Sequence, residues 1–505
     1  LKEERNDEMT SWKMEDLEAW DDRIQEKVAE FGLNCYPQEF EVCDQGAMLG
    51  YMAYHGMPSH YPHWSFGKAY EQTKTMYDYG VTGLPYEMVI NSDPCLAYLM
   101  RDNSQCLQVL TMAHVYGHND FFKNNFTFTS GTDASATLSS FKTRADRIRG
   151  YAEDPSIGED EVERFLDAAH ALSFNCNRNA AFVQQKPAEQ RQRLIDAATP
   201  PYDPFHRLHK RVEAGVPDLK RVPLEPEIDI LRFIRDNNHH LAGWQRDVLT
   251  IVDEEARYFI PQIETKIMNE GWASYWHHKI MNSLGLPQDI HLEFLVRHNQ
   301  VICPHPGGIN PYYVGFVIFR YLESGVDGVL AGSYLVTDGT GASRRMSERE
   351  REFFARLAKN VSSGLEFIFR VRETDRDVAF LRRFLTQGLG EELDLFTWKP
   401  RGEHLVVDHI SDDDGWDVVK GALLRQVGMG GFPTIKIKDA AYQGSRTMCL
   451  VHDHDGRDLD MGNAEKTLEH LATLWGHDVI LETVLHKKPT IMSLKDGKFN
   501  AKLVS

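Results

Sequence analysis

The spacing of hydrophobic residues predicts helices over most of the first 390 positions. Leu17, Trp20 and Ile24 fall on one face of a helix predicted over residues 11–32. A helix is also predicted from Asn103 or Ser104, either of which can cap it, to Phe122. Other predicted helices cover residues 159–172, residues 228–259 with a break near Asn237, and residues 262–284, with Pro261 separating the last two.

Strand-like patterns first appear at residues 86–90 and become frequent after residue 396. We predict strands over 404–410, 434–440, 447–453 and 478–484, with helices over 415–427 and 463–475 between them, and a last hairpin strand near residue 490. This order, βαββαβ, is typical of a ferredoxin-like α+β domain. The sequence therefore predicts a mainly α main domain over 1–395 and a small ferredoxin-like domain over 396–505. The polar stretch 176–225 is predicted to be a mobile insertion or linker.

Charge and composition indicate which kinds of binding partner and which cellular location to expect. The 505 residues carry a formal net charge of -19, which disfavours nucleic acid and anionic membrane surfaces. The seven cysteines form no C-x-x-C pair, which favours reduced thiols. The chain has no run of 18 apolar residues and no signal-peptide core, so we expect no membrane span and a cytoplasmic location.

Two histidines in the helix before Phe122 suggest a metal site. His114 and His118 are four residues apart, so their rings leave the same helix face. Glu270 points inward from the helical segment 268–281, where an unpaired carboxylate is costly unless it binds a metal. Two histidines and one glutamate with an open position for water are the arrangement of catalytic zinc. The alternatives are buried, hydrogen-bonded histidines and a buried ion pair at Glu270.

The position after His114 is unusual for a zinc peptidase, because Val115 stands where the motif H-E-x-x-H has its glutamate. Another group would have to act as the general base. The candidates are Glu87, His277 and Asp120. His277 shares a face with Glu270 and could instead be a fourth ligand, and Asp120 could orient a histidine.

Further polar residues are candidates for substrate binding or for orienting the ligands. The candidates are His60, His63, Trp64 and Lys68 in the segment 59–68, Asn119 beside the histidine pair, and His298 and Asn310 in the segment 297–316. Ordinary loop packing and a simple turn are the alternatives for these two segments.

Several long motifs, in order, resemble the SpoVR family (stage V sporulation protein R). They include "YPHWSFGK" (61–68), "YEMVINSDPCLAYLM" (86–100), "MAHVYGHNDFFKNN" (112–125), "MNEGWASYWH" (268–277) and "GINPY" (308–312). The tail motif "LWGHDVILE" (474–482) also resembles the family. The resemblance implies a link to spore formation and cortex peptidoglycan, although members also occur in bacteria that make no spores.

A fainter similarity is to the gluzincin metallopeptidases, in which a later helix with a glutamate follows the histidine helix. This resemblance implies a zincin-like main domain with His114, His118 and Glu270 as metal ligands. Val115 departs from the gluzincin pattern, so it puts ordinary peptidase chemistry in doubt.

Three functions follow as hypotheses. The first is a Zn²⁺-dependent hydrolase of an amide bond in a peptide or peptidoglycan-like substrate. The second is a non-catalytic regulator or scaffold in sporulation or stress signalling, which would act through protein partners. The third is an oxidoreductase or lyase, since histidine and carboxylate ligands also suit iron or manganese.

Overall fold

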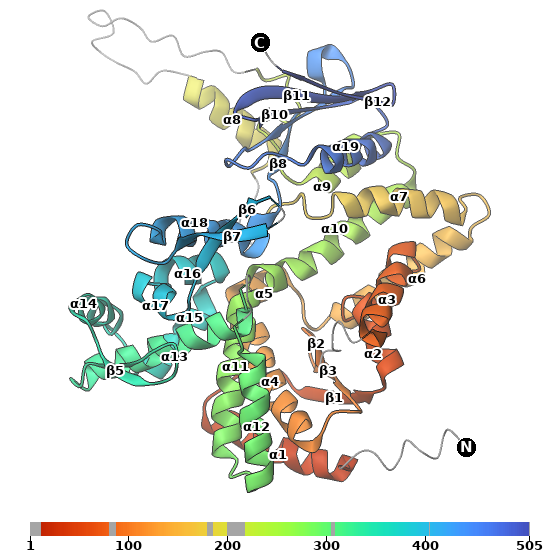
Figure 1. Cartoon of the computed structure of the whole chain (residues 1–505). Coiled ribbons are helices and arrows are strands. Elements are labelled where there is room, and N and C mark those ends of the chain that lie inside the picture. The colour runs from red at the N-terminus through yellow and green to blue at the C-terminus, as the bar shows by residue number, and fades with distance from the viewer. Residues whose placement is uncertain are drawn as a thin grey trace, which may run out of the picture. The chain divides into compact units, whose positions relative to one another are not determined.

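The computed structural model describes residues 12–79, 87–178, 185–198, 218–304, 309–402 and 404–503. The chain divides into two compact units. The first contains Leu1–Asp146 and Tyr258–Gly431, and the second contains Arg147–Arg257 and Phe432–Ser505 (Figure 1). Each unit is therefore built from two separate stretches of chain, and neither begins at residue 396.

The first unit is mainly helical. Its helices are α1 (Met14–Glu30), α2 (Gln45–Ala53), α3 (Trp64–Asp78), α4 (Gln105–Asn124), α5 (Phe126–Gly131), α11 (Lys266–Ser283), α12 (Gln288–Val301), α13 (Pro311–Leu330), α14 (Glu348–Leu357), α15 (Gly364–Thr374), α16 (Asp377–Phe384), α17 (Gln387–Glu392) and α18 (Trp416–Gln426). A short 3-10 turn covers Gly428–Gly431. Two further helices, α6 (Thr137–Glu153) and α10 (Gly243–Glu264), begin in one unit and end in the other.

Three small sheets accompany these helices. The largest has the order β1-β3-β2, with β1 (Gln38–Cys43) parallel to β3 (Cys95–Met100) and β2 (Glu87–Ile90) antiparallel to β3. Two antiparallel hairpins pair β4 (Leu335–Thr337) with β5 (Ser343–Arg345), and β6 (Phe396–Arg401) with β7 (His404–Ile410).

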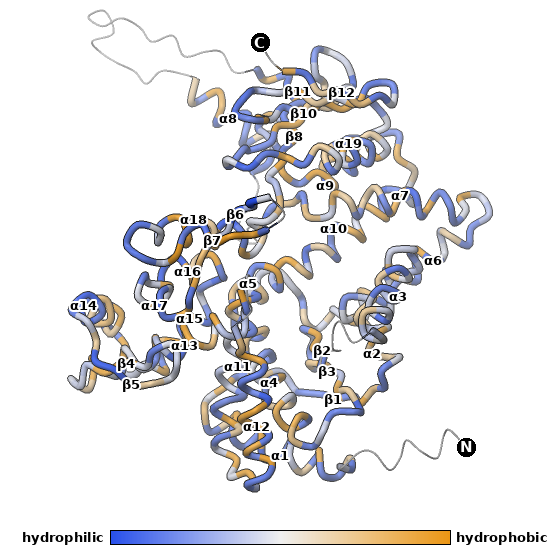
Figure 2. The backbone as a smooth tube through the Cα atoms, viewed as in Figure 1, coloured by the Kyte–Doolittle hydropathy of each residue, from blue (hydrophilic) through white to orange (hydrophobic). Residues whose placement is uncertain are grey.

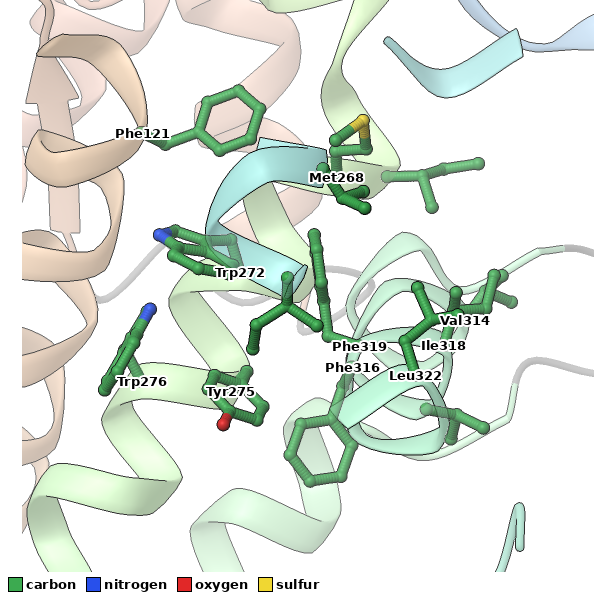
Figure 3. Packing of buried hydrophobic residues seen from close by; sticks show 14 of the residues in the cluster. Phe121, Met268, Trp272, Tyr275, Trp276, Val314, Phe316, Ile318, Phe319 and Leu322 are labelled. Carbon is green, nitrogen blue, oxygen red and sulfur yellow. The ribbon is translucent and has the colours of Figure 1, made fainter. Parts of the chain in front are cut away.

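Helix α11 lies in the core of the first unit, in close contact with α4 and α13. Its Trp272 packs against Trp276 and against Phe319 of α13, with ring centroids 5.5 and 5.0 Å apart (Figure 3). Glycine allows the close approach of the helix backbones. A Cβ atom on Gly271 would lie 2.3 Å from the Cα atom of Gly315 in α13. On the other side, α4 touches α11 at Gly117, where a Cβ atom would lie 2.6 Å from the Cα atom of Ala273.

The second unit combines helices with a five-stranded sheet. Its helices are α7 (Glu159–Ala171), α8 (Pro187–Ala198), α9 (Ile230–Asn237) and α19 (Met461–Trp475), and a 3-10 turn covers Tyr442–Gly444. The sheet has the order β12-β11-β10-β9-β8, from β8 (Ile435–Asp439), β9 (Met448–His452), β10 (Val479–Leu485), β11 (Lys488–Lys495) and β12 (Lys498–Leu503). Only β9 and β10 are parallel, and α19 connects them.

The ferredoxin-like prediction is wrong in its strand arrangement. The predicted strand 404–410 exists as β7, but it pairs with β6 in the first unit and not with the five-stranded sheet. Helix α18 likewise belongs to the first unit. The five-stranded sheet instead continues into β11, which confirms the strand predicted near residue 490, and into β12, which forms an antiparallel hairpin with β11.

Most predicted helices are confirmed, including the break near Asn237, where α9 ends. Ser104 is the N-cap of α4, because its hydroxyl accepts a hydrogen bond from the backbone N–H of Leu107. The prediction that Pro261 separates two helices is wrong. Pro261 lies inside α10, and the break comes at Thr265, before α11 begins.

The predicted insertion, the cysteines and the helices can also be compared with the structure. Much of the predicted insertion lies outside the described residues, and residues 187–198 within it form α8. All seven cysteines are free thiols. Hydrophilic residues interrupt the hydrophobic ones along the helices in Figure 2, and no described helix is long and apolar enough to cross a membrane.

Candidate metal centre

The predicted metal ligands converge where α4 and α11 pack together. His114 and His118 are one turn apart on α4, and both are buried. Glu270 faces them from α11, on the same side of that helix as the contact with Gly117. The short distance that Gly117 allows between the two helices thus brings side chains from distant parts of the sequence together.

The distances among the three donors suit a tetrahedral ion. The Oε2 atom of Glu270 lies 3.6 Å from Nε2 of His114 and 3.4 Å from Nε2 of His118. Ligand atoms bound to zinc at roughly 2.0–2.1 Å lie about 3.4 Å apart along the edge of a tetrahedron. Both Glu270–histidine distances are therefore near the spacing that a single zinc ion requires, and the donor atoms of the two histidines lie within 4.8 Å of each other.

A second carboxylate comes from the small sheet. Glu87 is the first residue of β2, where it pairs with Leu99 of β3. Its carboxylate lies within 4.8 Å of the donor atoms of His114 and His118, which themselves lie within the same distance of each other. Among the described residues, Glu87, His114 and His118 are three side chains close enough to one another to hold a metal ion, and Glu270 approaches the same two histidines from α11.

Two polar atoms at the centre of this group face each other at 3.6 Å without a hydrogen bond. Nε2 of His114 and Oε2 of Glu270 are buried and accept or donate no hydrogen bond within the described part of the chain. Buried polar atoms are normally satisfied, and leaving one without a partner is costly. A cation bound between these atoms would satisfy both, so the residues present fit a metal ion.

The protonation states also favour a cation. Burial lowers the pKa of His114 to about 4, which keeps its ring neutral. Burial alone would raise the pKa of Glu270, but its close contacts with His114 and His118 outweigh burial and hold that pKa well below its usual range. Near neutral pH, this leaves a neutral imidazole and a carboxylate, the forms that bind metals.

The other two groups respond differently. Burial raises the pKa of Glu87 to about 7, a value at which a carboxylate can both take up and release a proton. Burial also opposes protonation of His118, but its contacts with Glu270, Asn269 and Glu87 outweigh this effect and raise its pKa.

The second nitrogen of each histidine is held in place. Nδ1 of His118 lies 2.9 Å from Oδ1 of Asn269, and Nδ1 of His114 lies 2.9 Å from Nδ1 of His277. Contacts of this kind orient metal-binding rings and direct their Nε2 atoms toward the ion. His277 thus lies behind His114, on the side away from Glu270, and its own Nε2 contacts His298.

Asp120 and Asn119 are placed in structural contacts. The Asp120 carboxylate accepts hydrogen bonds from the Asn34 backbone and the Trp272 indole, and it forms an ion pair with Arg372 at 3.1 Å. The Asn119 side chain binds the backbone N–H and C=O of Tyr36, at 2.7 and 3.0 Å. These two side chains fasten α4 to its surroundings.

The segment before α3 forms an aromatic cluster. His60 is buried against Tyr61 and Phe66, with ring centroids 4.1 and 4.4 Å away. His63 caps α3, and Trp64 is 51% exposed with Lys68 above its ring. His60 also stacks on Tyr54 and lies near Phe141, so this segment contributes to an aromatic cluster.

Asn310 caps α13. Its side chain accepts hydrogen bonds from the backbone N–H groups of Tyr312 and Tyr313, and it donates to the carbonyl groups of Val301 and Cys303. Asn310 thereby fixes the first turn of α13, which carries Tyr312.

Sequence reasoning missed Asn269 and Tyr312. The Tyr312 ring lies 6.0 Å from the His114 ring, and the charge of Glu270 raises the pKa of its hydroxyl. Both residues lie within motifs quoted for the family resemblance, Asn269 directly before Glu270 and Tyr312 in "GINPY". The motifs could have identified these two residues as candidates, whereas hydrophobic periodicity could not.

Comparison with known proteins gives the family. A family model described as SpoVR like protein matches residues 11–432, and one described as SpoVR-like C-terminal domain matches residues 433–486. The chain belongs to the SpoVR family. In this SpoVR chain, the first match ends at residue 432, one residue after Gly431, the last residue of the first unit.

One relative of this SpoVR chain is a protein of Escherichia coli (strain K12). That protein, named "Uncharacterized protein YcgB", is 33% identical to this chain over 492 residues, which cover 93% of this chain and 92% of the relative. No solved structure matches the chain. A zincin-like fold therefore remains a prediction from the gluzincin resemblance.

Proposed function

We propose that this SpoVR chain is a metal-dependent hydrolase that cleaves an amide bond, with Zn²⁺ as the expected ion. The observation that carries the proposal is the position of Glu270 Oε2, 3.6 and 3.4 Å from Nε2 of His114 and of His118, close to the edge length of a zinc tetrahedron. The unsatisfied buried atoms at their centre support it. His114, His118 and Glu270 would hold the ion, which lowers the pKa of water and polarises a carbonyl group when bound.

The general base is proposed to be Glu87. Val115 cannot take a proton, and its side chain is fully buried in the core. Glu87 approaches the histidines from β2, a different element from the one that carries Glu270. From there its carboxylate can accept a proton from water and pass it to a leaving amine, the work of the missing glutamate.

The proposed substrate is a peptide or a peptidoglycan-like molecule, linked to sporulation or to cell-wall formation. The family resemblance supports this choice, together with the fit between an amide carbonyl and a His₂Glu centre. With the expected cytoplasmic location, such a substrate would be a precursor, a recycled fragment or a protein.

A second candidate follows from Glu87 itself. If its carboxylate binds the ion, the ligands are two histidines and two carboxylates, a set that also suits iron or manganese. The reaction would then be an oxidation or an elimination, and another group would have to serve as base.

Elemental analysis of the purified protein tests the proposal. We expect about one zinc ion per chain, and loss of that ion after combined His114→Ala and Glu270→Ala. His404→Ala is the matched control, because His404 is exposed on β7 in the same unit. Well under one metal per chain, with unchanged stability in chelator, would refute the metal centre. Iron or manganese would favour the second candidate.

Hydrolysis is tested separately. The zinc-loaded chain is incubated with peptides and with peptidoglycan stem-peptide fragments, and mass spectrometry detects newly cleaved amide bonds. We expect cleavage that disappears in His118→Ala. If in vivo function survives the loss of both His114 and Glu270, the chain acts instead as a regulator or scaffold.

A further inference from the structure

Three buried histidines form a hydrogen-bonded row that leads away from the metal centre. Nδ1 of His114 lies 2.9 Å from Nδ1 of His277, and Nε2 of His277 lies 2.7 Å from Nδ1 of His298. The three residues are only 3%, 0% and 4% exposed. They stand on α4, α11 and α12, so the row links three helices.

The chemistry of imidazole limits how this row can be protonated. Deep burial disfavours the charged ring, and a neutral ring has one N–H donor and one acceptor nitrogen. Each of the two N···N contacts needs one proton. Both contacts are satisfied only when all three rings donate in the same direction, either away from the metal centre or toward it.

A cation selects one of these directions, because it needs a lone pair on Nε2 of His114. We infer that His277 and His298 are positioning residues. His277 accepts a hydrogen bond from Nδ1–H of His114 and His298 accepts one from Nε2–H of His277, which leaves Nε2 of His114 without a proton. The inference rests on the proposed metal centre. With a metal bound, His114 donates from Nδ1 to His277, and His277 donates from Nε2 to His298.

His118, the second histidine ligand, is oriented by an amide side chain and not by another histidine. Nδ1 of His118 faces Oδ1 of Asn269, and an amide oxygen can only accept. The His118 tautomer is therefore fixed before any ion arrives, whereas the His114 tautomer depends on the direction of the row. The structure thus assigns unequal roles to two ligands that look equivalent in the sequence.

Zinc affinity of variants tests the inference. With Zn²⁺ alone as the probe, in competition with a chelating dye, we expect His277→Leu to bind roughly 10- to 100-fold more weakly. His277→Asn keeps an acceptor near the position of Nδ1, so its affinity should stay within about threefold of wild type. His278→Leu is the control for packing, because the His278 ring packs against His298 and Phe316, with ring centroids 4.8 and 5.6 Å away, but takes no part in the two N···N contacts, so the affinity should stay unchanged.

The affinities of these variants distinguish a hydrogen-bonding role of His277 from a packing role. An unchanged affinity in His277→Leu, or an equal loss in His277→Asn with both variants folded, would overturn the inference. A comparable loss in His278→Leu would show that packing, not hydrogen bonding, is responsible.

A second measurement reads the proton positions directly, without a measurement of zinc affinity. Neutron diffraction, or NMR with ¹⁵N-labelled histidine, locates the protons in the metal-free chain. We expect the row to run in one direction throughout, and to place a proton on Nδ1 of His114 once zinc is added. A doubly protonated His277 would overturn the inference. An intact row in a chain that binds no zinc would refute the proposed metal centre but not the row.

Discussion

Two glutamates at the metal centre differ in what surrounds them. Glu270 lies between two histidines at 3.4 and 3.6 Å, and its pKa is held low. Glu87 approaches from a strand, and burial raises its pKa to about 7. The same functional group is thus prepared for two tasks, with Glu270 suited to binding a cation and Glu87 suited to carrying a proton.

Substitution by glutamine distinguishes these tasks. Glu270→Gln removes a charged ligand, so we expect zinc affinity to fall on the order of 100-fold. Glu87→Gln keeps the shape but cannot take a proton, so zinc should stay bound while hydrolysis is lost. Dye competition and a cleavage assay on the same preparations measure both. Loss of zinc in Glu87→Gln would mean that Glu87 is a ligand.

At the scale of the elements, α11 carries the site and depends on both of its neighbours. Glycines set its distances to α4 and α13, and a side chain from α16 caps its first turn. The two oxygens of Asp377 accept hydrogen bonds from the backbone N–H groups of Ile267 and Met268, both at 2.9 Å. Helix N-termini need such acceptors, and Thr265 supplies none from its side chain.

Gly271→Ala tests the packing of α11. The added Cβ atom would meet the backbone of Gly315, which cannot rotate away, so we expect a loss of about 2–3 kcal/mol in unfolding free energy. Gly150→Ala is the control, since this glycine of α6 has no atom within 4 Å of the new Cβ. It should stabilise the chain by about 0.5–1 kcal/mol. Urea unfolding measures both, and equal effects would contradict the packing argument.

Asp377 should make stability depend on pH. Burial raises its pKa to about 7, although the two N–H groups of α11 oppose the rise. In the unfolded chain the carboxyl titrates near pH 3.9, so the folded state binds the proton more tightly. The stabilisation from this tighter proton binding is fully present below about pH 4, decreases above that pH and is lost as the pH rises through 7. Relative to Asp377→Asn, wild-type unfolding free energy should therefore fall between pH 5 and 7.5. A constant difference would contradict this.

Helices and candidate ligands could be predicted because their signals are local. The spacing of His114 and His118 and the Ser104 cap needed only neighbouring residues. Strand pairing needed information that the sequence does not display. Nothing local shows that β7 pairs with β6 instead of joining β8 and β9. Nor did spacing show that Glu87 comes close to the histidines while Asp120, two residues after His118, is engaged with Arg372.

At the scale of the whole molecule, the second unit joins an internal stretch to the C-terminal stretch. Asn238 donates hydrogen bonds to the carbonyl groups of Leu474 and Trp475, and Trp475 packs near Phe233 of α9. Glu227 also forms a β-bridge with Ile437 of β8, so the C-terminal stretch is joined to residues far upstream and the second unit is not a separable tail.

Truncation after Gly431 tests this architecture. We expect residues 147–178 and 218–257 to lose protection from hydrogen exchange, because their partners in α19 and the five-stranded sheet are gone. Protection in α4 and α11 should persist. Retained protection throughout the internal stretch would show that it folds without the C-terminal residues.

The two-stretch construction of the second unit also affects synthesis. A ribosome releases residues 147–257 long before residues 432–505. At roughly 5–20 residues per second, the wait lasts on the order of ten seconds or more. Throughout it, apolar faces such as that of Phe233 have no partner and can join neighbouring nascent chains. Translation speed and chaperone supply should therefore govern the yield of soluble protein more strongly than overall stability does.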